Sequence, residues 1–272
     1  MKKKILIIAA ICCVAAAVFV TFQIIDNATY TPRYVFESEF PPEYFIDMDA
    51  DIGDDVYLTI DRLLAEKENS KLIAEFEELK VYENDVIAYY MEQAMMYYHA
   101  IKVMEAERAD LIRNIPLKGE TEKLESLKKY IDGYKAGVKE FWNYSDTCYV
   151  VVKMKISPLI CKRYDNEPDV KDIVKLLEEL YPEKESREYK ILSDITKDDI
   201  DILYMRAENM GLSFLEYRNT VLKDAHFESR CYTYVNSYFN DKVYKTKSTE
   251  KRENHSRRWI ESQFDYFKLK AY

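Results

Sequence analysis

Few side chains in this sequence have the type and spacing that enzyme or metal sites require. The three histidines, His99, His226 and His255, are isolated from one another, and neither a Cys-x-x-Cys nor a His-x-x-x-His spacing occurs. A zinc site therefore has no support. No Gly-rich phosphate loop, dinucleotide fingerprint or Gly-x-Ser-x-Gly elbow is present. We predict no catalytic residues, no metal site and no cofactor, and we expect that the protein is not an enzyme.

Two weaker patterns have structural explanations. Ser-x-x-Lys occurs at residues 126–129 and 248–251, but the Ser-Asp-Asn and Lys-Thr-Gly motifs that accompany it in serine–lysine enzymes are absent. The alternating aspartates of residues 47–55 resemble the start of an EF-hand calcium loop. However, Ile52 and Leu58 stand where that loop needs Gly and Glu. We predict an acidic loop that caps the following helix, and the sequence leaves calcium binding open.

The cysteines divide into two groups. Cys12 and Cys13 lie in an apolar run near the start of the chain, and Cys148, Cys161 and Cys231 lie outside it. Three is an odd number, so these three can form at most one disulfide among themselves. The sequence does not establish the connectivity, and free buried thiols are the simplest interpretation.

One segment is unusually rich in methionine and tyrosine, with apolar residues around most of its helical circumference. It contains Tyr89, Tyr90, Met91, Met95, Met96, Tyr97, Tyr98 and Met104. Methionine adapts its shape, and Met-rich grooves suit varied apolar peptides. The alternative is a central helix that is buried on all sides. We predict a peptide-binding groove that contains Tyr90, Met91, Met95 and Tyr98.

Two long amphipathic segments must position this groove. Apolar residues recur every three or four positions from Ile87 to Leu111 and again from Leu124 to Phe141, which is a seam of coiled-coil type. Pro116 and Gly119 separate the two segments and indicate a turn. We therefore predict an antiparallel helical hairpin over residues 85–142.

The residues on either side of the hairpin are also mainly helical by pattern. Helical signals cover residues 56–79, with a break near residues 69–70, and further helices are expected over residues 168–182, 196–210 and 249–269, with a loop at 183–190. Gly211 fits the left-handed end of a helix, and Ser213 with Glu216 forms a capping box for the next one. Residues 148–156 alternate like a strand that Ser157-Pro158 ends, and a buried helix is the alternative.

The N-terminal residues read as a membrane anchor. Lys2, Lys3 and Lys4 precede an uncharged, largely apolar run over residues 5–25, which is long enough to cross a bilayer. The lysines predict a cytoplasmic N-terminus, and a cleaved signal peptide is the alternative. We predict a single-pass cell-membrane protein with an anchor at 1–25, a linker with an acidic loop at 26–55, and an extracytoplasmic helical domain at 56–272.

Composition agrees with a folded, mainly α-helical domain. The 272 residues are 48% hydrophobic and 33% charged, and only five are glycine, so we expect at most one or two short strands. Net charge is -9. Because the first 25 residues hold three lysines and no acidic residue, the remainder carries -12. Such a surface does not favour nucleic acid as a partner.

Two blocks of the sequence resemble the N-terminal chaperone domain of SurA-like and PrsA-like bacterial foldases. The first runs from Ile202 to Asn240, and the residues from Ala207 to Tyr217 carry the likeness. The second runs from Leu79 to Val86 and leads into the Met/Tyr segment. Together they cover about 100 residues. The resemblance implies a chaperone-like or binding role. The Gly-rich parvulin isomerase domain of these families has no counterpart here.

These features predict a membrane-anchored, extracytoplasmic domain that binds protein segments. We expect it to act like a chaperone toward unfolded or exported proteins and to have no isomerase activity. The alternative is a structural or scaffolding subunit of a cell-envelope complex that uses the same surfaces for one fixed envelope partner.

Overall fold

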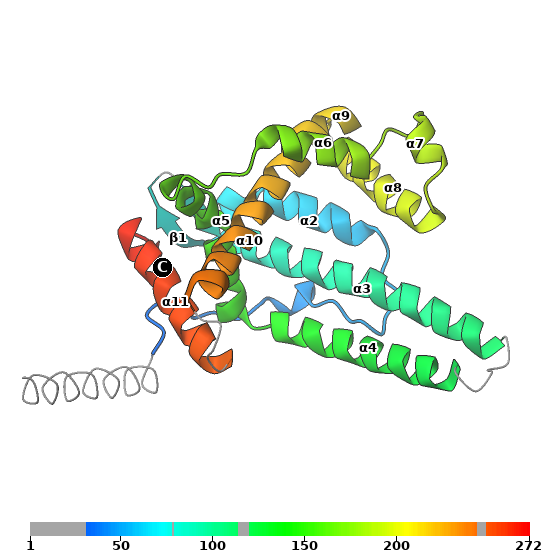
Figure 1. The fold of residues 1–272 in the computed structure, drawn as a ribbon, viewed down its shortest axis with the longest axis horizontal. Coiled ribbons are helices and arrows are strands. Elements are labelled where there is room, and N and C mark those ends of the chain that lie inside the picture. Colours follow the sequence, from blue (N-terminus) through cyan, green and yellow to red (C-terminus); the bar gives the residue numbers. More distant parts are fainter. Residues whose placement is uncertain (1–30, 78, 114–119, 244–248) are drawn as a thin grey trace, which may run out of the picture.

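The fold is mainly α-helical, as predicted (Figure 1). A computed structural model describes residues 31–77, 79–113, 120–243 and 249–272. The main helices are α2 (Asp55–Ala65), α3 (Glu83–Arg113), α4 (Glu120–Phe141), α5 (Tyr144–Arg163), α6 (Val170–Leu180), α8 (Asp194–Asn209), α10 (Lys223–Val243) and α11 (Thr249–Tyr266). Shorter elements are α7 (Arg187–Lys190), α9 (Phe214–Tyr217), η1 (Pro42–Tyr44), η2 (Lys67–Asn69) and the π-helical turn η3 (Arg218–Leu222). The strands are β1 (Leu72–Phe76), β2 (Leu79–Tyr82) and β3 (Lys270–Ala271).

The N-terminal anchor stays a prediction, because residues 5–25 lie outside the part that the structure describes. Within the described part, none of the helices combines the length and the apolar character that a bilayer crossing requires.

The predicted hairpin is confirmed, with helices over Glu83–Arg113 and Glu120–Phe141. The two helices run antiparallel, because Lys123 Nζ lies 2.7 Å from Glu107 Oε1 while the rings of Tyr97 and Tyr134 meet edge-to-face with centroids 5.2 Å apart. From α4 the seam residues Leu127, Ile131 and Val138 are buried. The predicted turn at 114–120 lies almost wholly outside the described residues.

A three-stranded antiparallel sheet corrects both the prediction of helix beyond residue 70 and the prediction of at most one or two short strands. The strand order is β2-β1-β3, and β1 and β2 form a hairpin. Leu, Ala, Glu and Lys dominate this stretch and favour helix locally. Tertiary packing decides otherwise, because Ile73, Phe76 and Val81 are fully buried in the core and residues 270–271 supply a pairing edge from the other end of the chain.

The predicted strand at 148–156 is wrong, and the alternative of a buried helix is right. Cys148, Val152 and Ile156 recur every four residues and are fully buried on one face of α5. A run that is apolar at nearly every position satisfies both periodicities, so alternation alone could not decide. Pro158 lies inside α5 and does not end it.

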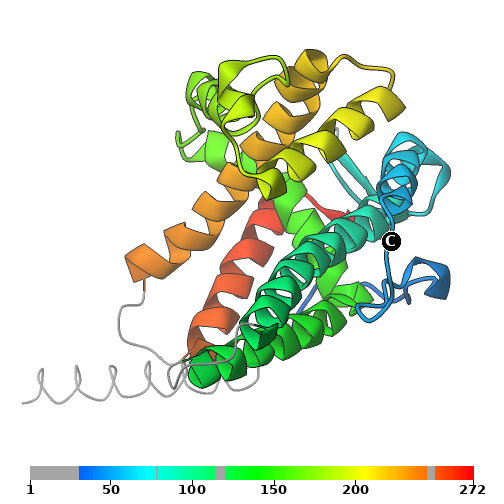
Figure 2. The same cartoon turned by 90° about the vertical axis from the view of Figure 1, so that its right-hand side faces the viewer.

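The helices from α6 to α10 form a second group, which lies on the opposite side of α3 from α4 (Figures 1 and 2). The turn inside this group is as predicted: Gly211 has φ of 69°, and Ser213 and Glu216 form a complete capping box. The helix expected from residue 196 begins at Asp194, and its N-cap is Ser193, whose hydroxyl accepts from the Thr196 N–H. Residues 187–190 form the short α7 within the predicted loop.

The segment before α2, predicted to be a linker, lies across the domain and contributes to its core. Phe36, Phe40, Ile46 and Met48 are buried, and Phe40 stacks on Trp142 at 4.7 Å between ring centroids. The acidic residues behave differently from the prediction of a helix cap. Asp54 occupies the N-cap of α2 without a side-chain bond. Elsewhere in this loop, Asp49 pairs with α4 and Asp51 accepts from a tyrosine of α3.

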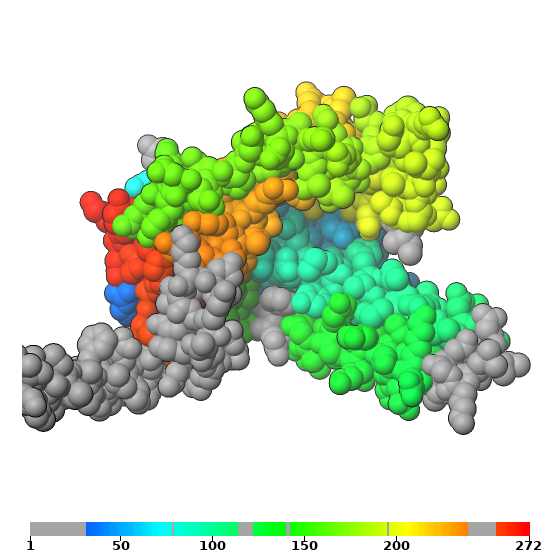
Figure 3. All heavy atoms as spheres, in the orientation of Figure 1, coloured from blue at the N-terminus to red at the C-terminus, as the bar shows by residue number. Residues whose placement is uncertain are grey.

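Residues near the two ends of the described chain also meet. Arg33 donates from its backbone N and from Nε to the fully buried carboxylate of Glu261, at 3.1 and 3.3 Å. In the space-filling view, the surface is hollowed between the α7–α8 region and the α3–α4 hairpin (Figure 3).

Candidate functional site

The four residues predicted to form the peptide groove lie together on α3, but they are buried. Tyr90, Met91, Met95 and Tyr98 are 0%, 4%, 1% and 4% exposed. The hydroxyls of Tyr90 and Tyr98 accept from the backbone N–H groups of residues 46 and 52, at 3.2 and 3.0 Å. The chain's own N-terminal segment therefore covers this part of α3, and these four side chains belong to the core and not to an open groove. Of the methionines and tyrosines in this helix, Met96 is the exposed one.

A cavity of about 350 Å³ lies where the first turns of α3 meet α2, α5 and the second helical group. Its apolar lining is Leu64, Ala88, Val151, Met154, Met210, Val221, Leu222 and Ala225. Its polar lining is Asp85, Tyr89, Glu92, Lys155, Arg206, Tyr217, Asp224 and Glu228. We call this cavity the interhelical pocket. Apolar walls with a few convergent polar groups are the common composition of a binding site.

The sharp turn at Gly211 brings both sides of the interhelical pocket together. The turn reverses the chain, so that Arg206 and Met210 before it and Tyr217 and Val221 after it line the same space. The π-helical turn η3 follows directly and contributes Val221 and Leu222. A π turn holds one more residue than an α turn and is frequent at functional sites.

A network of charged groups closes one wall of the pocket. Arg206 donates to Asp61 Oδ1 from Nε and Nη2, at 2.9 and 2.7 Å, and to Glu92 Oε1 at 3.0 Å. Burial alone would lower the pKa of Arg206, but the charges of Glu92 and Asp61 raise it above its ordinary value. Asp61 Oδ2 is buried and has no hydrogen-bond partner among the described residues. Arg206 is thus held as a fixed cation between two carboxylates.

The opposite wall contains a second ion pair and a buried lysine behind it. Lys155 Nζ donates to both carboxylate oxygens of Glu228, at 2.9 and 3.1 Å. Lys153, two residues earlier, donates to Asn236 Oδ1 and lies 5.2 Å from the ring centroid of Tyr232. No carboxylate of the described chain pairs with Lys153. Burial lowers the pKa of its amino group to about 8.

The ionisable lining of the interhelical pocket consists of four carboxylates, two tyrosines, one lysine and one arginine. No His, Cys, Ser or Thr is among its lining residues. Burial raises the pKa of Tyr89 and Tyr217 to about 12, so both phenols are protonated at neutral pH. The thiols of Cys148, Cys161 and Cys231 are free and buried elsewhere in the core. Within the described residues, no group of three or more His, Cys, Asp or Glu side chains is placed to hold a metal ion.

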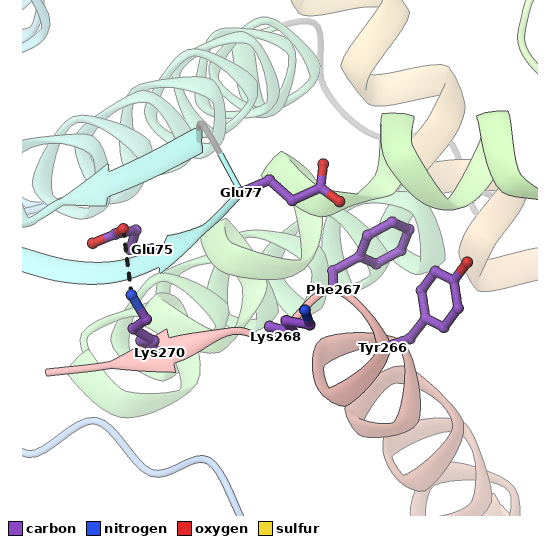
Figure 4. Close-up of a pocket in the computed structure, with 6 residues that line it drawn as sticks. All are labelled: Glu75, Glu77, Tyr266, Phe267, Lys268 and Lys270. Atoms are coloured by element: carbon purple, nitrogen blue, oxygen red, sulfur yellow. Dashed lines mark ion pairs between the residues drawn. The ribbon is translucent and has the colours of Figure 1, made fainter.

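A second cavity lies at the sheet, beside the β1–β2 turn (Figure 4). It is lined by Glu75, Glu77, Tyr266, Phe267, Lys268 and Lys270. Glu75 and Lys270 point toward one another, 3.7 Å apart. Four of its six lining residues are charged and none is aliphatic, so it lacks the apolar walls of the interhelical pocket.

The sequence reasoning missed the interhelical pocket because its residues are spread from Leu64 to Glu228. One signal was present in the capped turn at Gly211, which fixes the helices on either side of it to one another. No protein-family model, curated protein or solved structure matches this chain.

Proposed function

We propose that this protein binds segments of other polypeptides and that the interhelical pocket receives an apolar side chain of the bound segment. The observation that supports this most directly is the pocket itself, whose aliphatic and methionine walls enclose about 350 Å³ and include no His, Cys, Ser or Thr. That volume is at the small end for ligand sites and suits a side chain better than a large cofactor. Met154 and Met210 can adapt to different shapes.

The proposed biological setting is supported by two features of the sequence. The apolar run at 5–25 favours a single-pass anchor that leaves the domain outside the cytoplasm, where exported proteins arrive unfolded. The resemblance to the chaperone domain of SurA-like and PrsA-like foldases rests partly on the capped turn that builds one side of the pocket. We therefore place the protein among chaperone-like, membrane-anchored binding proteins without isomerase activity.

Blocking the pocket tests this function. Ala225 is exposed at the pocket and lies on α10, so Ala225→Phe should fill the entrance without disturbing the core. The matched control is Ala109→Phe, which adds the same ring at an exposed position of α3 far along the hairpin. Both variants of the full chain, in neutral detergent, are compared by thermal melting and by suppression of aggregation of a reduced, unfolded client.

We expect Ala225→Phe to keep the melting temperature of the wild type and to lose most of the suppression, while Ala109→Phe keeps both. Suppression that survives in Ala225→Phe would move the binding site elsewhere on the molecule. A wild type that never suppresses aggregation, but co-purifies with one protein at a fixed ratio, would favour the scaffolding alternative.

A further inference from the structure

We propose that the interhelical pocket prefers segments in which an arginine or lysine stands beside a bulky apolar residue. This inference rests on the proposed function and specifies the class of segment that is bound. Its starting point is the charge of the lining, which includes four carboxylates and two basic groups. The pocket therefore carries an excess of negative charge before any partner arrives.

Both basic groups are already engaged by carboxylates of the protein. Lys155 is bound to both oxygens of Glu228, and Arg206 is bound to Asp61 and Glu92. An acidic side chain entering the pocket would have to compete with these bonds, which are partly buried and costly to break. A basic side chain can instead bind a carboxylate that keeps one oxygen free, as Glu92 does, or one whose own partner is exposed and weakly held, as Asp224 is.

The carboxylates that a basic side chain would meet are accessible. Asp224 has 74% of its side chain exposed and Glu92 has 39%. Glu92 uses Oε1 for its bond to Arg206, so Oε2 can accept from a second donor. Asp224 lies 3.4 Å from the neighbouring Lys223, and an exposed pair of this kind is weak.

Lysine and arginine also fit the apolar part of the pocket. Their aliphatic stems lie along apolar surface while the charged head stays at the rim. Met154, Met210 and Leu222 are half-buried and line the pocket between the two walls. A neighbouring apolar residue of the segment would occupy the remaining volume. The charge of -12 on residues 26–272 adds a longer-range attraction for basic segments that salt will weaken.

Three fluorescent peptides with the same leucines and phenylalanines test the preference. They carry lysine, glutamine or glutamate at the same two positions, and their dissociation constants are measured by anisotropy with the full chain in neutral detergent. We expect the lysine peptide to bind about tenfold more tightly than the glutamate peptide at low salt, with the glutamine peptide between them, and the ratio to shrink at high salt.

Charge reversal at the rim supplies the matched pair of variants. Asp224→Lys should make the affinities for the lysine and glutamate peptides about equal. Glu125→Lys, at an exposed position of α4, should leave the ratio of these two affinities unchanged. Equal binding of all three peptides would overturn the charge preference and leave the proposed function in place. Binding of none of them would overturn both.

Discussion

Replacing Lys153 by methionine should stabilise the protein at neutral pH, which is the reverse of what most core substitutions do. The amino group is buried and pairs with no carboxylate of the described chain. Its pKa falls from an ordinary 10.5 to about 8. Each pKa unit corresponds to about 1.4 kcal/mol, so charging this lysine in the folded state costs about 3 kcal/mol. Methionine is similar in length and carries no charge.

The replacement also has a cost, because Asn236 loses the donor that its side-chain oxygen now accepts from. An unmade buried hydrogen bond costs about 1 kcal/mol, which leaves a net gain of about 2 kcal/mol for Lys153→Met. The control is Lys155→Met on the same helix. It removes the partner of Glu228, so we expect a loss of about 1 kcal/mol instead.

The gain should depend on pH in a way that identifies its cause. The unfolded chain binds a proton at Lys153 below pH 10.5, whereas the folded chain binds it only below about pH 8. Between these values the unfolded state holds more protons, so the stability of the wild type rises with pH and its deficit against Lys153→Met closes. Urea melts of both proteins from pH 7 to 10.5, followed by tryptophan fluorescence, measure the difference. A difference that is absent at pH 7, or constant across the range, would refute the assignment.

Three further outcomes are expected. Ser213→Ala removes one helix cap and should cost about 1 kcal/mol of stability. Gly211→Val should cost more, because valine is strained at a φ of 69°. Urea melts in which the two variants lose the same stability would contradict the turn. Arg33→Gln should cost about 1 kcal/mol by removing one of the two guanidinium partners of the buried Glu261, which keeps Arg257 at 3.9 Å, and adding Glu261→Gln should restore part of the loss. N-terminal sequencing of the membrane-bound protein should find the run at 5–25 retained, and a soluble protein that lacks it would show cleavage.

Much of the fold could be predicted because local signals and the final packing agree. The α3–α4 hairpin has one apolar seam on each helix and a turn between them, and the Gly211 turn has its cap residues in order. The β1–β2 hairpin was missed because the same residues favour helix when isolated, and the pairing that overrides them comes from residues 270–271. Such a non-local contact leaves no periodicity in the sequence.

The candidate site was harder to predict than the fold. The Met/Tyr segment correctly indicated a helix with apolar residues on most sides, but the pattern cannot show what covers each side. Residues 36–52 supply that cover, and their aromatic and proline-rich composition reads locally as a linker. The interhelical pocket opens instead beside Ala88 and Glu92 on the same helix. Its position depends on how α10 packs against α5 and how α8 packs against α2, which single-helix patterns do not encode.

The contacts of β3 and of Glu261 can form only after nearly the whole chain has been synthesised, so they delay the completion of folding. The core around β1 is completed by residues 270–271, about 195 positions later in the chain, and the buried Glu261 meets its partner 228 positions away. At 5–20 residues per second, synthesis alone separates β1 from β3 by on the order of 10 to 40 s. During that interval Ile73 and Phe76 have no finished core to enter, and the free edge of β1 can pair with other chains. During its own synthesis the protein therefore passes through a partly folded, aggregation-prone state. Under the proposed function, it protects other proteins in that same state.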